Sequence, residues 1–338
     1  MMTRSVLIAL VVFACANLFG TTVTKSFREV TAKADADFQA GHLDAAIAEY
    51  NRIIALNLTP QLASLAVMRR GNCYYAKHDL DRAIADFDQA LRLDPRNAAA
   101  YDNRANALDA RGDRADAIKD YNESARLNPR NIYVYVNRAS LLTEEGDFTS
   151  ALADYAKAMT INPHDEMAYT GRAYLYLMQR APGRALKEAN AAIAIAPGSV
   201  SGYSARARAY MQMGRYAEAE ANIKKMMHLK NFDRTTALSV LAWFRATCPD
   251  RHFRDGRQAL DAARRHCQSM TFFGFDCQDT LAAAYAEIGD FDQAVNYQTQ
   301  ALETAPSRFP LLSEMKRRLE LYKQHRPYRD EPKGKARL

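Results

Sequence analysis

Residues 98–131 read AAAYDNRANALDARGDRADAIKDYNESARLNPRN, and this 34-residue pattern decides the fold. Its closing phrase, SARLNP, recurs three more times with small changes: ALRLDP at 90–95, AMTINP at 158–163 and AIAIAP at 192–197. The prolines that end these four phrases are 34 residues apart, three times in succession. Self-similarity at a period of this length is typical of a repeat array, in which each unit is one supersecondary motif.

An alanine lies twelve residues before each of these prolines, and the alanine series extends in both directions. Its members are Ala46, Ala83, Ala117, Ala151, Ala185, Ala219, Ala259 and Ala294, with spacings of 37, 34, 34, 34, 34, 40 and 35 residues. A small residue at one fixed position allows two helices to approach closely. Apolar residues recur at intervals of three and four, so each unit fits two amphipathic helices. A pair such as Gly112-Asp113 would end the first helix and cap the second, and the proline would stop the second.

The order of tyrosine, small residue, alanine, aromatic residue and proline over 34 residues resembles the tetratricopeptide repeat. The resemblance implies an all-α solenoid of about eight antiparallel helix pairs with a C-terminal cap helix. We divide the chain accordingly into an array of six units at 27–233, two divergent units at 234–306, and a cap helix with a basic tail at 307–338.

The divergent units carry the phrases LAWFRATCPD, RDGRQAL and DTLAAAYAEIGDFDQAV, and the tail carries LELYKQHRPYRD. Together these phrases resemble the end module of many bacterial tetratricopeptide proteins, most of which have no assigned biochemical role. The resemblance therefore indicates a bacterial protein with a folded end unit, and it names no ligand. We expect 309–323 to form the cap helix, and Pro327 and Pro332 to mark a frayed tail after it.

The chain opens with MMTRSVLIALVVFACANLFG, in which Arg4 precedes an unbroken apolar run at 6–13. Ala14-Cys15-Ala16 then fits the small-x-small pattern of a signal-peptidase site. Our first interpretation is a cleaved signal peptide at 1–16, which would make the protein periplasmic or secreted. An uncleaved inner-membrane anchor at 5–23, lipidation at Cys15 and a buried core helix are the alternatives.

The 338 residues include 46 Lys and Arg against 39 Asp and Glu, a net charge of +7. Residues 313–338 alone contain nine basic and four acidic residues, so most of the excess lies in the tail. The nearly neutral body argues against a nucleic-acid partner, which would require a basic stripe on the folded surface. The tail is either a solvated end or a region attracted to anionic lipid or an acidic partner.

A second ladder at the 34-residue period consists of charged side chains. Its basic members are Arg70, Arg104, Arg138, Arg172 and Arg206, and its acidic members, sixteen residues later, are Asp86, Asp120, Asp154 and Glu188. Either the arginines line a binding face, or each pairs with the acid on the partnering helix. We favour pairing, because an unpaired arginine row would make the body strongly basic.

In tetratricopeptide proteins the first helix of each unit lines a concave groove, and the resemblance assigns groove positions to Asn72, Tyr75, Asn103, Asn106, Tyr133, Asn137 and Tyr174, with Asp102 and Asp109 among the others. An asparagine there can pair with a peptide N–H and a C=O, although a merely solvated polar face is the alternative. A groove that grips a terminal carboxylate would place lysines where Met68 and Tyr133 stand and an arginine at Asn137. A carboxylate clamp is therefore disfavoured.

The five cysteines do not form a disulfide-dense scaffold. Cys73 lies within a first helix, and we expect it to be a small buried residue. Cys248, His252, His266, Cys267 and Cys277 gather in the divergent units, but their spacing matches no zinc motif. A Cys267–Cys277 disulfide, which spans a single connection, is the better interpretation, and we assign no metal site.

Sequence motifs for catalysis and cofactors are absent: the chain has no GxxxxGK[ST], GxGxxG, HExxH or CxxC. We therefore expect no enzymatic activity and no cofactor. The preferred function is a protein-interaction scaffold outside the bacterial cytoplasm that binds a peptide or helix of a protein partner. The alternatives are an adaptor of an envelope or secretion assembly, held at the membrane by the N-terminal segment and the basic tail, and a protein that binds or hydrolyses a polymer such as a glycan.

Overall fold

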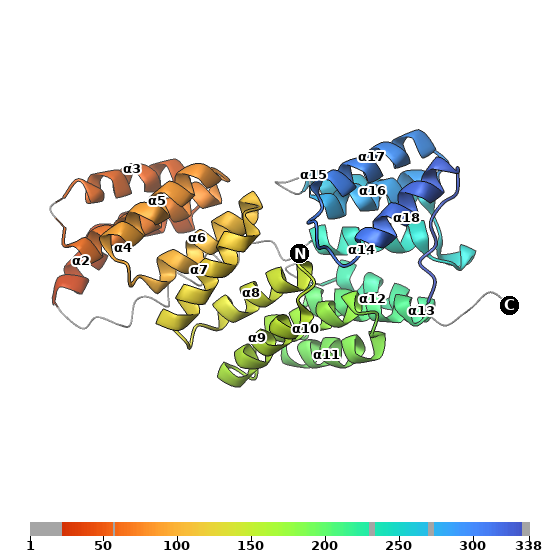
Figure 1. Cartoon of the computed structure of the whole chain (residues 1–338), viewed down its shortest axis with the longest axis horizontal. Helices are drawn as coiled ribbons and strands as arrows, with labels where there is room; N and C mark the ends of the chain where they lie inside the picture. Colours follow the sequence, from red (N-terminus) through yellow and green to blue (C-terminus); the bar gives the residue numbers. More distant parts are fainter. Residues whose placement is uncertain (1–21, 57, 230–233, 270–273, 333–338) are drawn as a thin grey trace. The chain divides into compact units, whose positions relative to one another are not determined.

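A computed structural model describes residues 22–56, 58–229, 234–269 and 274–332 (Figure 1). In these ranges the chain is all-α, as the repeat period predicts. Eight antiparallel pairs follow one another: α2 (Thr22–Gln39) with α3 (Leu43–Ile54), α4 (Pro60–Ala76) with α5 (Leu80–Leu93), α6 (Ala98–Arg111) with α7 (Arg114–Leu127), α8 (Ile132–Glu144) with α9 (Phe148–Ile161), α10 (Glu166–Met178) with α11 (Pro182–Ile195), α12 (Val200–Gln212) with α13 (Tyr216–Met227), α14 (Arg234–Thr247) with α15 (Gly256–Gln268), and α16 (Phe275–Glu287) with α17 (Phe291–Thr304).

The predicted cap helix is α18 (Leu312–Lys323), and a short 3₁₀ helix, η2 (Arg251–Phe253), lies in the longer turn between α14 and α15. The solenoid of eight helix pairs with a C-terminal cap helix is therefore confirmed. Each pair consists of a first helix, such as α4 or α6, and a second helix, such as α5 or α7.

The turn within each pair follows from local chemistry. Gly112 has a φ of 100° and Gly146 a φ of 79°, which is the left-handed conformation that ends a helix. His78 takes the same place with a φ of 61°, so this turn is made without glycine. Asp147 then accepts a hydrogen bond from the backbone N–H of Ser150 and caps α9.

The periodic alanines pack where the helices of a pair cross. All eight members of the series, from Ala46 to Ala294, are completely buried. Their methyl groups leave room for the aromatic residue four positions later, and Phe87, Tyr121 and Tyr155 are buried as well. At Gly71 the fit is tighter, because an added Cβ would lie 2.7 Å from Cε1 of Phe87. Small and large residues thus alternate across the helix interface, as close packing requires.

The chain divides into two compact units, and the boundary falls inside α8, between residues 141 and 142. The described part of the first unit, residues 22–141, contains α2 to α7 and most of α8. Ala34, Tyr50, Ile53 and Cys73 belong to its core. The burial of Cys73 agrees with its expected role as a small core residue.

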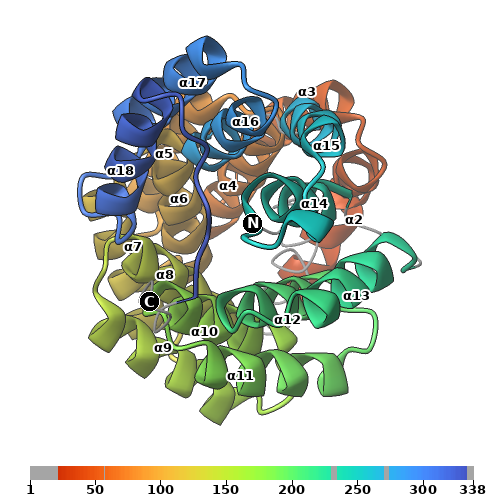
Figure 2. The same ribbon diagram turned by 90° about the vertical axis from the view of Figure 1, so that its right-hand side faces the viewer.

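The second unit, residues 142–332, closes on itself through α18 (Figure 2). Phe309 and Met315 share a hydrophobic cluster with Met178 at the end of α10. Arg180, directly after α10, forms an ion pair with Glu314 of α18. These contacts join elements 134 residues apart in the sequence, so the last helix meets one of the first helices of the unit.

The segment after α18 is not a frayed tail, and the expectation is wrong for residues 324–332. Tyr328 is buried, and the backbone N–H of Asp330 donates to the carbonyl of Thr247 at 3.0 Å. Proline predicted the end of helix here, but helix termination does not imply disorder, since side chains beyond Pro327 have partners on α14 and α16.

The proposed signal peptide at 1–16 lies outside the described residues, as does nearly all of the alternative anchor at 5–23. Within the described ranges, no helix is both long and apolar enough to span a bilayer.

Candidate functional site

Arginines of the ladder form ion pairs with acidic residues of neighbouring helices. Two side-chain nitrogens of Arg70 reach the Asp86 carboxylate, at 2.8 and 2.7 Å. Arg104 binds Asp120 in the same way, at 2.6 and 2.8 Å. In addition, Arg104 donates to Asp88 of the preceding second helix at 2.6 Å. These arginines therefore join successive second helices and are not available to line a binding face.

The same ladder continues in the second unit with one change of chemistry. Arg172 pairs with Glu188 at 2.7 Å, whereas Arg206 donates to the amide oxygen of Asn222 at 2.7 Å. Arg172 and Arg206 also lie over the tyrosine three residues earlier in the chain, at 5.9 and 5.0 Å from the ring centroid. The arginine position thus has the same bridging role where the acid is absent.

The predicted groove asparagines of the first unit come together in pairs between neighbouring first helices. Nδ2 of Asn103 on α6 donates to Oδ1 of Asn72 on α4 at 2.9 Å. Nδ2 of Asn137 on α8 donates to Oδ1 of Asn106 on α6 at 3.1 Å. We call these four residues the asparagine face. The two members of each pair are 31 residues apart, three fewer than the repeat. This separation places the two amides beside each other on neighbouring first helices.

Asn106 uses its hydrogen-bonding groups within the protein. Its Oδ1 also accepts from the hydroxyl of Tyr121 at 2.9 Å, and its Nδ2 donates to the carbonyl of Asp102 at 2.9 Å. It is therefore a positioning residue for Asn137. By contrast, Nδ2 of Asn72 and Oδ1 of Asn103 have no partner among the described residues, and neither is a fully buried, unsatisfied atom. These two atoms are an adjacent donor and acceptor that the asparagine face can offer to a ligand, and Oδ1 of the more exposed Asn137 is a further acceptor.

Asp102 lies beneath this face and is almost completely buried, at 1% exposure. Burial raises the pKa of its carboxyl from 3.8 to about 7, although hydrogen bonds from Asn131 and Asn106 act in the opposite direction. The Nδ2 atom of Asn131 is 3.3 Å from Oδ2 of Asp102. A carboxyl with this pKa is partly neutral at physiological pH, so this region carries less negative charge than the sequence suggests.

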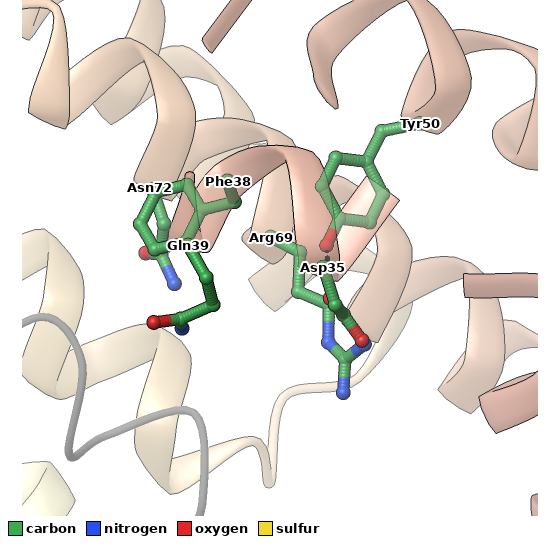
Figure 3. A pocket seen from close by; sticks show the side chains of 6 residues that line it. All are labelled: Asp35, Phe38, Gln39, Tyr50, Arg69 and Asn72. Carbon is green, nitrogen blue, oxygen red and sulfur yellow. Dashed lines mark hydrogen bonds and ion pairs between the residues drawn. The ribbon is translucent and has the colours of Figure 1, made fainter. Parts of the chain in front are cut away.

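A shallow pocket adjoins the asparagine face at Asn72 (Figure 3). It has room for only about one water molecule, and its lining residues are Asp35, Phe38, Gln39, Tyr50, Arg69 and Asn72. In Figure 3 the amides of Gln39 and Asn72 lie on one side, and Asp35, Tyr50 and Arg69 meet on the other. The pocket therefore combines an apolar wall, Phe38, with two neutral amides.

The charged side of this pocket is internally paired. The hydroxyl of Tyr50 donates to Asp35, and Arg69 forms an ion pair with the same carboxylate. Burial raises the pKa of Tyr50, so the hydroxyl remains protonated and continues to donate. Because the two charges neutralise each other, the pocket favours a neutral or amide-bearing group over an ion.

The remaining predicted positions are distributed between the two units. Tyr75 and Tyr133 are half-buried on α4 and α8 of the first unit. Tyr174 lies on α10 of the second unit and is 37% exposed. At the position that corresponds to Asn103 and Asn137, the second unit has Gly171, whose absent side chain leaves room for the Tyr155 ring at 2.5 Å from an added Cβ. The paired asparagines are therefore not continued at α10.

Sequence reasoning missed Asp35, Phe38, Gln39 and Arg69. The first repeat was recognised mainly by its second helix, so the groove positions of its first helix were not assigned. The available signal was the period itself, because Asp35 precedes its partner Arg69 by 34 residues.

The divergent units contain the expected cysteine pair. Cys267, at the end of α15, and Cys277, in α16, are joined in a disulfide with their Cα atoms 5.7 Å apart. Cys248 is a free, buried thiol after α14, and burial raises its pKa to about 11. His252 pairs with Asp250 at 2.8 Å. Among the described residues, no three His, Cys, Asp or Glu side chains are grouped to hold a metal ion.

Family models of the tetratricopeptide repeat match residues 31–98 and 136–200, residues 98–131, and residues 200–230 and 276–308. The chain belongs to the tetratricopeptide repeat superfamily. Members of this superfamily are typically interaction scaffolds, and a scaffold is the class of function that the fold supports. None of the curated proteins matches the sequence significantly.

Solved structures of the superfamily are similar to this chain at low sequence identity. A tetratricopeptide repeat protein from Parabacteroides merdae is 18% identical over 88% of this chain and 99% of its own, with a TM-score of 0.55. A thermophilic protein of the superfamily from Thermus thermophilus is 23% identical over 53% of this chain and 99% of its own, with a TM-score of 0.46. YrrB, described as having an unusual peptide-binding site, is 20% identical over 56% of this chain and 95% of its own, with a TM-score of 0.42. At these identities the likeness concerns the fold.

Proposed function

We propose that residues 22–141 bind an extended or helical segment of a partner protein, without catalysis. The observation that carries this proposal is the pair of free hydrogen-bonding atoms on the asparagine face, Nδ2 of Asn72 and Oδ1 of Asn103. One donor and one acceptor side by side match the C=O and N–H of a peptide backbone. Phe38 and Gln39, at the adjoining shallow pocket, would contact the surface of a neutral side chain of the bound segment.

A binding selection followed by substitution tests this proposal. Random twelve-residue peptides are selected against the full chain, and the binders are measured by fluorescence anisotropy. The double variant Asn72→Ala/Asn103→Ala should weaken binding roughly tenfold to a hundredfold, because two hydrogen bonds of about 1 kcal/mol each are removed. Asn51→Ala is the matched control, since Asn51 is an exposed asparagine of a second helix in the same unit.

Unchanged affinity in the double variant, together with correct folding by circular dichroism, would contradict the proposal and move the binding site away from the asparagine face. Equal losses in the double variant and the Asn51→Ala control would also contradict it, because the effect would then be indirect.

We also propose that the protein acts outside the cytoplasm. The sequence at 1–16 has the composition of a signal peptide, and the Cys267–Cys277 disulfide suits an oxidising compartment. Intact-mass analysis of the protein from its native cells tests this location. Loss of residues 1–16 would support export, whereas full-length protein in the membrane fraction would favour the anchor at 5–23.

The membrane-held adaptor is favoured by one further observation. Lys316, Arg317 and Lys323 are exposed on α18, and this basic face could contact anionic lipid. Flotation of the chain with vesicles containing phosphatidylserine should fail for the double variant Lys316→Glu/Arg317→Glu if this face makes the contact.

A further inference from the structure

Residues 328–330 are an aromatic, a basic and an acidic residue in succession, and the side chain of each contacts helices or turns of the second unit. We propose that the second unit contains a peptide-binding site filled by the chain's own tail, and that this site accepts an extended segment with an aromatic, a basic and an acidic residue in succession. The site lies in residues 142–332 and is distinct from the asparagine face, so this proposal does not depend on the function proposed above.

The aromatic position is occupied by Tyr328, which is 5% exposed. Its ring centroid lies 6.1 Å from that of Trp243 on α14, and the guanidinium of Arg318 lies 5.2 Å from both ring centroids. Arg318 is held by two hydrogen bonds to Asp279, at 2.9 and 2.8 Å. The receptor for the tyrosine is therefore a tryptophan and a fixed cation, a combination that favours an aromatic ring.

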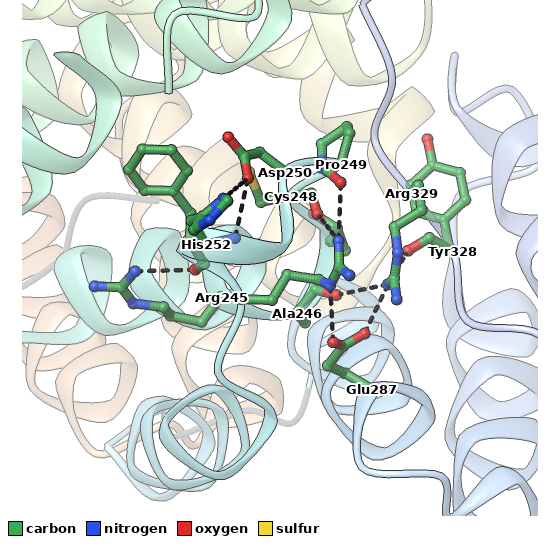
Figure 4. A network of polar contacts seen from close by, with 12 residues as sticks. Arg245, Ala246, Cys248, Pro249, Asp250, His252, Glu287, Tyr328 and Arg329 are labelled. Atoms are coloured by element: carbon green, nitrogen blue, oxygen red, sulfur yellow. Dashed lines mark hydrogen bonds and ion pairs between the residues drawn. The ribbon is translucent and has the colours of Figure 1, made fainter. Parts of the chain in front are cut away.

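The basic position is occupied by Arg329 (Figure 4). Its guanidinium is 2.7 Å from the carboxylate of Glu287 and donates to the carbonyl of Ala246 at 3.2 Å. Glu287 is also bound by Arg254 at 3.0 Å, and Arg254 donates to the carbonyls of Cys248 and Pro249. These contacts hold Glu287 in place without any contribution from the tail.

The acidic position is occupied by Asp330, which is contacted through both its side chain and its backbone. Its carboxylate accepts from Nε1 of Trp243 and pairs with Arg180, each at 3.2 Å. Its backbone N–H donates to the carbonyl of Thr247 at the end of α14, at 3.0 Å. A main-chain hydrogen bond combined with successive side-chain contacts is how extended peptides are commonly recognised.

The receptor residues are positioned by partners outside the tail, which distinguishes a binding site from ordinary packing. Arg318 is held by Asp279, Glu287 by Arg254, and Arg180 by Glu314 of α18. Residues 324–326, which join α18 to the site, are exposed, but their backbone N–H groups donate to carbonyls in the last turn of α18, and the ring centroid of His325 lies 5.1 Å from that of Phe291. They form a short, ordered tether. A site whose groups are preorganised in this way should survive release of the tail and bind the same sequence in trans.

The tether also explains why an external peptide would compete poorly with the tail. Even a short flexible linker holds its ligand at an effective concentration on the order of millimolar, and the ordered tether at 324–326 holds the tail at least as close to its site. A free segment with a dissociation constant of about 100 μM would therefore need concentrations well above that value to displace the tail.

The test uses a fluorescein-labelled peptide of sequence QHRPYRDEP, which corresponds to residues 324–332. The receiving protein is the full chain with Tyr328→Ala and Asp330→Ala, which remove the aromatic and acidic side-chain contacts of the tail and leave the receptor residues unchanged. We expect this variant to bind the peptide at least tenfold more tightly than the unsubstituted chain. Peptides carrying the change Arg329→Ala or Asp330→Asn should bind at least tenfold more weakly, because the first loses the contacts with Glu287 and the Ala246 carbonyl and the second loses the charge that pairs with Arg180.

Failure of the folded variant to bind the peptide, or equal binding by the variant and the unsubstituted chain, would overturn the proposal. A second measurement covers a variant that does not fold. Hydrogen exchange of the unsubstituted chain is followed at 324–332 while millimolar peptide is added. Faster exchange of this segment supports displacement from a binding site, whereas unchanged exchange overturns the proposal by showing that the tail is a fixed part of the core.

Discussion

Asp102 is expected to make the protein less stable as the pH rises, and the substitution Asp102→Asn should remove that loss. The carboxyl is 1% exposed, and its burial raises the pKa from 3.8 to about 7. A carboxyl with a raised pKa in the folded state binds its proton more tightly there than in the unfolded chain. Its contribution to stability is therefore fully present below pH 3.8 and is lost as the pH rises through 7.

The size of this effect follows from the shift of roughly three units. At about 1.36 kcal/mol per unit, full ionisation in the folded state costs roughly 4 kcal/mol relative to the protonated form. More than half of that loss, roughly 2 to 3 kcal/mol, falls between pH 5 and pH 8. Asparagine has nearly the same shape and no charge, so it avoids the cost at every pH.

The assay is urea unfolding followed by circular dichroism at pH 5 and pH 8. The stability difference between Asp102→Asn and the unsubstituted chain should increase by about 2–3 kcal/mol in favour of the variant at the higher pH. Asp116→Asn on α7 is the control, because Asp116 forms a solvent-exposed pair with Lys119 and its substitution should leave the stability nearly unchanged at either pH. A variant that is no more stable than the unsubstituted chain at pH 8, or a difference that does not grow with pH, would refute the reasoning.

Three further predictions concern packing and closure. Gly71→Ala should lower the free energy of unfolding by about 1 kcal/mol, measured by urea unfolding, because the clash with Phe87 outweighs the gain in helix propensity; increased stability would contradict this account of the close approach. Cys267→Ser should lower the free energy of unfolding by about 2–3 kcal/mol, because the unfolded chain regains the entropy of a loop with a ten-residue separation. The effect should disappear when both proteins are compared in reductant. Arg180→Ala should lower the free energy of unfolding by roughly 1–3 kcal/mol and speed hydrogen exchange in α18, because the carboxylates of Glu314 and Asp330 lose their cation. Unchanged exchange in α18 would show that the hydrophobic cluster alone closes the unit.

Much of the candidate site could be predicted from the period. Residues sixteen apart face each other across a helix pair, which is why Arg104 and Asp120 were paired correctly from the sequence. The same period placed Asn72 and Asn106 on one position of successive first helices, and Asn103 and Asn137 on another. It could not reveal that Asn106 uses its amide internally, because that depends on the reach of the Tyr121 hydroxyl from the second helix.

The sequence by itself determined the helical pairs, their alanine contacts and the superfamily, because these features depend on interactions within about one repeat and recur with it. Only the tertiary structure decided how the second unit closes and where the tail lies. Arg180 meets Asp330 across 150 residues, a separation that no repeat period encodes. Pro327 correctly predicted the end of helix, but the order of the following residues depends on Trp243, Glu287 and Thr247, which only folding brings to the same place.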